Sequence, residues 1–231
     1  MPSIEDENEL TTQYDSLARD FYALEAADPS SGHHREKFYA RLDFIAPGAR
    51  LLDLGCGGGK DLVHYRGLGA VVHGVDSSPE MVSSARQRVP GADVLVSVLD
   101  RIPFPDQHFD VVLSKYAIQS VADVGAVFRE IHRVLAPGGT LMYLAVHPFR
   151  QFFERRRPDA DYFAPTIVES SFFQGKITVR EPTHTLNDYL SVDFLSRFDI
   201  DDFLEGVEPS AEMVGALRYP GFMIVRARKR A

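Results

Sequence analysis

A cluster of four glycines directly after a short apolar segment constrains this chain more than any other feature. The cluster, Gly55 to Gly59 with Cys56 in second position, follows apolar residues 51–54 and precedes a helical pattern from Lys60. A strand, a glycine turn and a helix start bring backbone N–H groups close to a ligand, where bulky side chains would hold it away. Four glycines also cost conformational entropy on folding, and a turn that binds no ligand gives no reason for this cost. The sequence therefore predicts a bound ligand here.

Two phosphate-binding motifs fit this turn poorly. A P-loop requires Gly, four residues, Gly-Lys and then Ser or Thr, but Leu54 and Asp61 occupy its first and last positions. A dinucleotide fingerprint, Gly-x-Gly-x-x-Gly, would need glycine at Lys60. Asp53 lies two residues before the first glycine, and its carboxylate disfavours pyrophosphate. The pattern favours a cationic or hydroxyl-bearing ligand.

Composition limits the function classes. The 231 residues are 45% hydrophobic, which predicts a single domain with one sizeable core. The net charge of −8 disfavours nucleic acid and anionic membranes as partners. The single cysteine, Cys56, fits a small turn residue in a reducing compartment, and the N-terminus lacks a secretory pattern, so we expect a cytoplasmic protein. Adjacent His33-His34 would diverge on a helix, so we expect no metal site.

Strand and helix patterns alternate from Ala49 to Val146. Near-continuous apolar strands separated by helices indicate a parallel sheet covered on both faces. The predicted strands span residues 51–54, 70–75, 92–99, 109–114 and 140–146, followed later by 198–204 and 221–228. Helical spacing predicts further helices over residues 11–26, 33–45 and 185–197. Residues 147–182, rich in aromatic side chains, break the alternation and suggest an insertion over one end of the sheet.

Polar residues follow the carboxyl ends of several predicted strands. These are Gly55–Gly59, Asp76, Asp100 and Ser114-Lys115-Tyr116. Ligands of open parallel sheets bind at this edge, so we expect these residues to converge. Asp76 ends the strand after the glycine turn, which suits a carboxylate that accepts two ribose hydroxyls. Helix capping is the alternative for Asp76, but Ser78 already fits that role. Asp100 and the Ile102 backbone are placed to meet an adenine edge, unless Asp100 is simply a loop residue.

Five sequence blocks in this order resemble the class I S-adenosylmethionine-dependent methyltransferases of the small-molecule type. The blocks are residues 51–59, 72–81, 100–106, 109–112 and 133–141. The resemblance implies a Rossmann-like, doubly wound, seven-stranded α/β sheet, mostly parallel, whose last strand is antiparallel. It also implies S-adenosylmethionine as cofactor and a small-molecule acceptor, with neither a nucleic acid nor a membrane as partner. The oligomeric state stays open.

The resemblance implies roles for individual residues. Gly55 and Gly57 would face the methionine part of the cofactor, Asp76 the ribose and Met81 the adenine. Tyr14 and Tyr22 are similar to the family's N-terminal lid, where aromatic rings favour a sulfonium by cation–π contact. The full set of expected cofactor-binding residues is Tyr14, Tyr22, Asp53, Gly55, Gly57, Asp76, Ser77, Met81, Asp100, Arg101, Ile102 and Ser114.

The sequence departs from the family pattern after the fourth strand. Many relatives carry His-His or Gly-His there, whereas this chain has Ala-Ile-Gln-Ser-Val at residues 117–121. The first candidate general base is therefore His147, just past the fifth strand, followed by His184 and Tyr116. A structural or pocket-lining role is the alternative for each. The Asn-Pro-Pro-Tyr motif of enzymes that methylate nucleic-acid bases is absent at residues 114–117.

We predict one methyltransferase domain over residues 1–231. It divides into an N-terminal helical lid (1–48), a cofactor-binding core (49–146), a substrate-covering insertion (147–190) and the final strands (191–231). Whether the acceptor nucleophile is nitrogen, oxygen or carbon stays open. The alternatives are a protein of this fold that acts as a cyclase or isomerase or only binds the cofactor, and a methyltransferase for RNA or protein. The acidic composition disfavours RNA.

Overall fold

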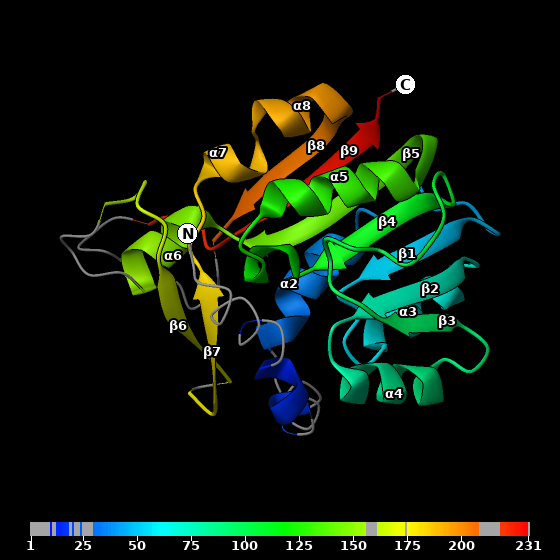
Figure 1. The fold of residues 1–231 in the computed structure, drawn as a ribbon, viewed down its shortest axis with the longest axis horizontal. Helices are drawn as coiled ribbons and strands as arrows, with labels where there is room; N and C mark the ends of the chain where they lie inside the picture. The colour runs from blue at the N-terminus through cyan, green and yellow to red at the C-terminus, as the bar shows by residue number, and fades with distance from the viewer. Residues whose placement is uncertain are drawn as a thin grey trace.

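The computed structural model describes residues 30–155, 161–173, 175–207 and 218–230, together with residues 10, 13–18, 20 and 24. These residues build a seven-stranded sheet in the order β3-β2-β1-β4-β5-β9-β8 and a separate two-stranded sheet, β6-β7 (Figure 1). The strands are β1 (Arg50–Leu54), β2 (Val71–Asp76), β3 (Asp93–Val96), β4 (Phe109–Lys115), β5 (Leu135–Val146), β6 (Ile167–Phe172), β7 (Ile177–Pro182), β8 (Phe198–Gly206) and β9 (Phe222–Lys229). The helices are α2 (Ser30–Tyr39), α3 (Lys60–Gly67), α4 (Pro79–Arg88), the short 3-10 helix η1 (Ile118–Ser120), α5 (Val124–Val134), α6 (Pro148–Arg155), α7 (Leu186–Tyr189) and α8 (Val192–Arg197).

The strand pairing confirms the predicted fold class. Strand β1 pairs in parallel with both β2 and β4, and β4 pairs in parallel with β5. Strand β9 is antiparallel to its neighbours β5 and β8. The strand order reverses between β1 and β4, which is where open α/β sheets bind their ligands. The glycine turn after β1 lies at this switch point.

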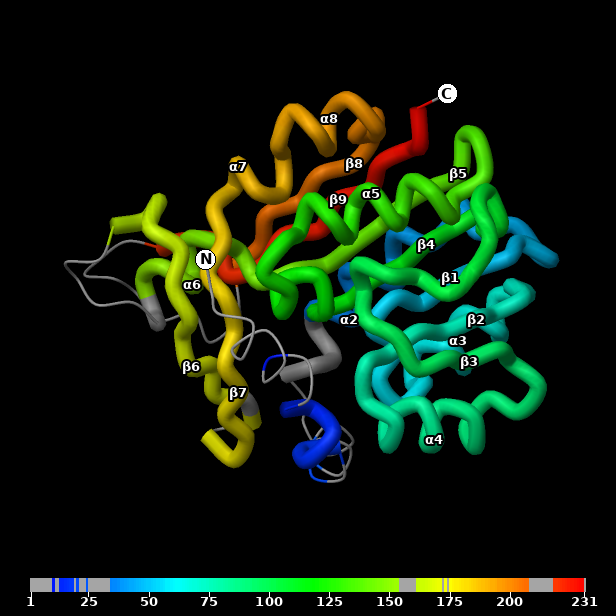
Figure 2. Tube along the Cα trace, viewed as in Figure 1, coloured from blue at the N-terminus to red at the C-terminus, as the bar shows by residue number. Residues whose placement is uncertain are grey.

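The sheet buries both of its faces. Along β1, Leu52 and Leu54 pack with the buried side chains of α5, α7 and α8, whereas Leu51 packs with those of α2, α3 and α4. Successive side chains of a strand point to opposite faces, so a strand covered on both sides buries nearly every side chain, as β1 does from Leu51 to Leu54. Figure 2 shows the same arrangement of helices and sheet as a trace of the Cα atoms.

Two expectations about elements outside the core were wrong. The helix expected over residues 185–197 is two short helices, because the Ser191 hydroxyl accepts the Phe194 N–H and starts α8 anew after Leu190. Helix α2 ends at Tyr39 rather than residue 45, and the chain continues in turns. The insertion expected over residues 147–182 contains α6 and an antiparallel hairpin, β6-β7. Within the described residues, no helix has the combined length and apolarity needed to cross a membrane.

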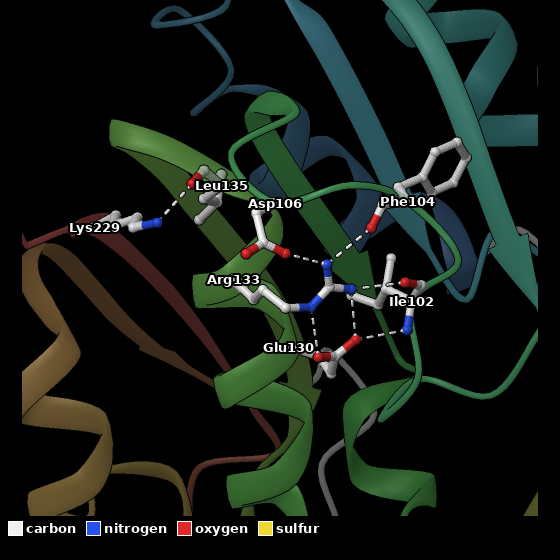
Figure 3. Close-up of polar contacts among 7 residues, drawn as sticks. All are labelled: Ile102, Phe104, Asp106, Glu130, Arg133, Leu135 and Lys229. Carbon is white, nitrogen blue, oxygen red and sulfur yellow. Dashed lines mark hydrogen bonds and ion pairs between the residues drawn. The ribbon is translucent and has the colours of Figure 1, made fainter.

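Arg133 pins the loop between β3 and β4 to helix α5 (Figure 3). Its guanidinium donates to both carboxylate oxygens of Glu130 and to the carboxylate of Asp106, each at 2.8 Å. It also donates to the carbonyl oxygens of Ile102 at 2.8 Å and Phe104 at 2.9 Å. All five guanidinium N–H groups are thereby used. Hydrogen bonding from Arg133 lowers the pKa of Glu130, although burial opposes it.

Replacing Arg133 with alanine should lower the free energy of unfolding by about 1.5–3 kcal/mol, because the variant strands loop carbonyls and a carboxylate that were bonded to a charge. Urea unfolding measures this loss. Arg129 of the same helix is the matched control: its side chain is 49% exposed and pairs with Asp123 and Asp193 at the surface. Arg129→Ala should cost only about 0–1 kcal/mol. Equal losses in the two variants would contradict the assigned role of Arg133.

Candidate functional site

The glycine turn is held against the end of β2 by backbone hydrogen bonds. The N–H groups of Gly55 and Cys56 both donate to the Val75 carbonyl, at 2.8 and 3.0 Å. Gly55 has a φ of 79° and Gly57 a φ of 48°. These left-handed conformations disfavour residues with a Cβ atom, which is one reason for glycine at both positions.

The space around each glycine shows which glycines are needed for close packing and which one leaves room for a ligand. A Cβ atom on Gly55 would lie 2.2 Å from the Ala117 Cβ, and one on Gly59 would lie 3.0 Å from Ala85. A Cβ atom on Gly57 would meet no described atom within 4 Å. Gly55 and Gly59 are therefore needed for close packing, whereas Gly57 faces open space that a ligand can occupy.

Asp76 lies beside Gly57 at the end of β2. Its two carboxylate oxygens accept the N–H of Gly57 at 2.8 Å and that of Ser78 at 3.0 Å. Burial raises its pKa, and backbone N–H groups from Ser78, Gly57 and Ser77 oppose this shift. Each carboxylate oxygen keeps a further lone pair, so the group is able to accept ligand hydroxyls in addition.

Asp53 is a buried carboxylate with an unused acceptor. It is 2% exposed, and its Oδ2 atom has no hydrogen-bond partner among the described residues. Burial, followed by the nearby charge of Asp61, raises its pKa. Buried polar atoms are normally satisfied, so an orphaned carboxylate oxygen next to a ligand-facing glycine fits a ligand that brings a hydrogen-bond donor.

Asp61 connects the glycine turn to α2 and β4 through buried charges, which the sequence alone did not reveal. It forms ion pairs of 3.1 Å with both Arg35 and Lys115, and it accepts the hydroxyl of Tyr39. Burial favours its neutral form, but the charges of Lys115 and Arg35 hold its pKa below the usual range. The start of α3 is thereby fixed to the two elements that flank the turn.

The N-terminal segment reaches two parts of the site. Asp15 accepts the Ser78 hydroxyl at 2.7 Å and the Glu80 N–H at 3.2 Å, at the start of α4. Gln13 exchanges two hydrogen bonds of 2.8 Å with the backbone of Arg180 in β7. Residues 13–18 therefore lie between the β6-β7 hairpin and α4, as Figure 1 also shows.

The lid tyrosines stay predictions. Tyr14 is half-buried within this segment, and Tyr22 lies outside the described residues.

The residues expected near the adenine differ in their burial and in their hydrogen bonding. Met81 is buried in the first turn of α4, where its N–H donates to Ser78 Oγ. Asp100 and Arg101 are exposed. The Ile102 N–H donates to Glu130, and its carbonyl accepts from Arg133, so neither backbone group of Ile102 is left to meet adenine directly.

The hydroxyl of Ser114 is used inside the sheet. It donates to the Leu54 carbonyl at 2.8 Å and is buried, so it ties β4 to β1 directly under the glycine turn. The Ser114 hydroxyl proton is therefore already used in this hydrogen bond and is not donated to the cofactor. Any influence of Ser114 on the cofactor would act through the position of β1.

His147, the first candidate base, is enclosed. Its Nε2 atom lies 2.8 Å from Glu205 Oε1, and its Nδ1 atom accepts the Phe149 N–H at 3.1 Å. Its side chain is fully buried, and burial lowers its pKa. Both ring nitrogens thus serve protein contacts that join the end of β5 to β8 and α6.

The other two candidates lie closer to the end of β4. Tyr116 has a φ of 56° and its hydroxyl lies 2.6 Å from Nδ1 of His34 in α2. His184 donates from Nε2 to the Gln119 carbonyl in η1 at 3.0 Å. The fold therefore brings His184 from the insertion to the segment after the fourth strand. Among the described residues, no group of three or more His, Cys, Asp or Glu side chains is placed to hold a metal ion.

Known proteins with similar sequences and folds support one family. The methyltransferase domain pattern matches residues 52–143. A demethylmenaquinone methyltransferase of Symbiobacterium thermophilum is 34% identical over 65% of this chain and 65% of its own length. A malonyl-acyl-carrier-protein O-methyltransferase of Yersinia pestis is 35% identical over 52% of this chain and 46% of its own length. An S-adenosylmethionine-dependent methyltransferase structure from Mesorhizobium loti has a TM-score of 0.66 and 27% identity, and covers 90% of this chain and 97% of its own.

The aligned segments span about half the length of the first curated relatives, 50% and 46%. The methyltransferase domain pattern itself runs from Leu52 to Tyr143, so it includes the glycine turn and the strand ends that carry Asp76 and Asp100. Together with the sheet order and the site geometry, this match places the chain in the class I S-adenosylmethionine-dependent methyltransferases, a family whose cofactor is S-adenosylmethionine.

Proposed function

We propose that this protein transfers the methyl group of S-adenosylmethionine to a nucleophile on a small-molecule acceptor. The observation that carries the proposal is the open space at Gly57, bordered by the orphaned Asp53 carboxylate and by Asp76. The names of the relatives, a demethylmenaquinone methyltransferase and a malonyl-acyl-carrier-protein O-methyltransferase, support methyl transfer in metabolism.

The chain's own residues bind and orient the cofactor. Asp53 would accept hydrogen bonds from the methionine ammonium, Asp76 would accept those of the ribose hydroxyls, and Met81 would pack beside the adenine. When bound, S-adenosylmethionine supplies a methyl group already activated by the sulfonium charge. Well-oriented reactants gain about 7–11 kcal/mol over free ones, so positioning by these residues can supply much of the catalysis.

His184 is the residue that we propose as general base. Its Nε2–H donates to a carbonyl, which only accepts, so the lone pair of the neutral ring lies on Nδ1. The place of His184 beside η1, directly after β4, supports this role. His147 is less suited, because both of its ring nitrogens already serve the Glu205 and Phe149 contacts.

A labelled-methyl assay against an acceptor panel, combined with calorimetric titration of the cofactor, tests the proposal. We expect cofactor binding together with transfer of label to a small molecule. His184→Asn should slow this transfer while leaving the cofactor affinity unchanged. Cofactor binding without transfer to any small molecule, RNA or protein would favour a cyclase, an isomerase or a simple binder. Label found only in RNA or protein would contradict the small-molecule acceptor.

A further inference from the structure

Lys115, the last residue of β4, brings a positive charge into the interior beside the glycine turn. Its side chain is only 14% exposed, and its Nζ atom lies 3.1 Å from Asp61 Oδ2. A lysine is rarely buried to this degree unless a carboxylate pairs with it. Asp61, however, also pairs with Arg35 and accepts the hydroxyl of Tyr39. The second cation is therefore more than Asp61 alone needs for charge neutrality.

The strand register places Lys115 on the same face of the sheet as Asp53. Strand β4 runs parallel to β1, with Leu113 beside Asp53. Side chains alternate between the two faces along a strand, so Lys115, two residues after Leu113, points to the face that Leu113 and Asp53 share. Helices α2 and α3 cover this face, since Leu113 packs with their buried side chains. Lys115 and Asp53 therefore lie in one layer with Asp61 of α3.

The charged groups around Asp53 leave one negative charge in excess. Asp53, Asp61 and Asp76 carry three negative charges when ionised, and Lys115 and Arg35 carry two positive ones. Each of the other four groups acts on Asp53 through its charge. A buried charge that no opposite charge balances is costly, so this excess favours a ligand that brings a cation. The ammonium of S-adenosylmethionine is such a cation.

Three neutral titratable side chains complete the surroundings of Asp53. They are Tyr39 of α2, Tyr65 of α3 and Cys56 of the glycine turn, and burial raises the pKa of each. These groups therefore stay protonated at neutral pH and add no charge. The balance between the three carboxylates and the two cations thus determines whether Asp53 is ionised.

Asp53 is the carboxylate that would take up a proton first. Its Oδ2 atom has no partner among the described residues, whereas Asp61 has two ion pairs and Asp76 accepts two backbone N–H groups. Burial, followed by the charge of Asp61, raises the pKa of Asp53, and Lys115 is the strongest influence that lowers it. Without Lys115, Asp53 would be neutral over a wider range of pH, and a neutral carboxyl group does not attract an ammonium by charge.

We propose that Lys115 is a positioning residue of the cofactor site that acts through Asp53. Its ammonium balances the Asp61 carboxylate, so that Asp53 keeps the negative charge that attracts the methionine ammonium; this rests on the proposed function. The same ammonium also ties β4 to α3 through the ion pair with Asp61. Charge balance and mechanical attachment are two different roles, and they predict different pH profiles and different effects of a second substitution.

The pH dependence of binding in Lys115→Met tests the proposal. S-adenosylhomocysteine has the amino-acid ammonium of the cofactor, whereas 5′-methylthioadenosine shares its adenosine and sulfur but has no ammonium. Both are titrated calorimetrically into the full-length protein between about pH 5.5 and 7, where an α-ammonium stays protonated. A nearby opposite charge lowers a carboxyl pKa by about 1–3 pH units, so S-adenosylhomocysteine should bind Lys115→Met at least about tenfold more weakly at the acid end and recover as the pH rises. Binding of 5′-methylthioadenosine should stay within about twofold of wild type at every pH.

The double variant Asp61→Asn, Lys115→Met separates charge balance from attachment. It removes the ion pair but leaves Asp53 and Asp76 opposite Arg35, which is the same excess of one negative charge as in the wild type. S-adenosylhomocysteine should therefore bind it within about threefold of wild type and with the wild-type pH profile. Weak binding by the double variant would mean that Lys115 only fastens β4 to α3, and would overturn the proposal even if Lys115→Met alone does not fold.

Lys176→Met is the matched control for the loss of one positive charge. Lys176 is an exposed residue in the turn between β6 and β7, so its loss should leave the affinity for S-adenosylhomocysteine within about twofold of wild type. An equal loss of affinity in Lys176→Met and Lys115→Met would overturn the proposal. Wild-type affinity of Lys115→Met at every pH would overturn the role of Lys115 and leave the proposed function, whereas no binding of S-adenosylhomocysteine by the wild type would overturn both.

Discussion

Asp76→Ala should weaken S-adenosylmethionine binding by about 10²–10⁴-fold. Two hydrogen bonds from ribose hydroxyls to a carboxylate contribute about 1.5–3 kcal/mol each, and each 1.4 kcal/mol corresponds to tenfold in affinity. The Asp76 carboxylate also holds the Gly57 and Ser78 N–H groups, so its loss loosens the turn that faces the cofactor. Isothermal titration calorimetry of the variant beside the wild type measures the effect.

Asp93→Ala is the matched control for this measurement. Asp93 is an exposed aspartate that begins β3, at the opposite end of the strands from Asp76. The substitution removes the same side chain and charge but touches no part of the site, so the affinity should stay within about twofold of wild type. A similar loss in both variants would indicate a general charge effect. An unchanged affinity in Asp76→Ala would mean that the ribose lies elsewhere.

Gly55→Ala should lower the free energy of unfolding by about 2–5 kcal/mol. The left-handed backbone accounts for about 1–2 kcal/mol and the overpacking against Ala117, at 2.2 Å, for about 1–3 kcal/mol more. Gly91→Ala is the matched control, because Gly91 has a φ of 80° and no described atom within 4 Å of a new Cβ. It should cost only the backbone part. Urea unfolding compares the two, and equal costs would contradict the tight Gly55–Ala117 contact.

Gly57→Ala should separate ligand binding from folding. Its new Cβ atom has room inside the protein, so the variant should fold with a loss of about 1–2 kcal/mol, like Gly91→Ala. The same Cβ atom occupies the space that we assign to the cofactor, so S-adenosylmethionine affinity should fall by at least about a hundredfold, as overpacking of 1–3 kcal/mol adds to distortion of the turn. Affinity equal to that of Gly91→Ala would place the ligand away from this turn.

The core of the fold was predictable because its signals are local. The mostly apolar β1, the glycine turn and the start of α3 lie within a few neighbouring residues, and β1 spans Arg50–Leu54 where the pattern predicts 51–54. The start of α4 is equally local: the Ser78 hydroxyl accepts the Met81 N–H, and Pro79 occupies the first turn. Periodicity and capping preferences predict such elements without knowledge of their distant neighbours.

The rest of the site depends on contacts between distant residues. Asp61 meets Arg35 and Lys115 only in the folded chain, and no local pattern marks such a pair. His147 and His184 look alike in sequence, but the fold surrounds the first with Glu205 and Phe149 and brings the second to Gln119.

The β6-β7 hairpin was missed for a related reason. Its strands pair through an antiparallel register outside the main sheet, and the aromatic residues of 147–182 predicted an insertion without indicating its secondary structure.

Calorimetric titration of the wild-type protein with S-adenosylhomocysteine, the demethylated cofactor, tests the central claim most directly. It shares the ribose, the adenine and the amino-acid ammonium that Asp76, Met81 and Asp53 are proposed to bind, and it cannot turn over. We predict saturable binding of one molecule per chain, lost in Gly57→Ala and retained in Gly91→Ala. No binding heat at millimolar ligand, or equal binding by both glycine variants, would contradict the assignment of the glycine turn as the cofactor site.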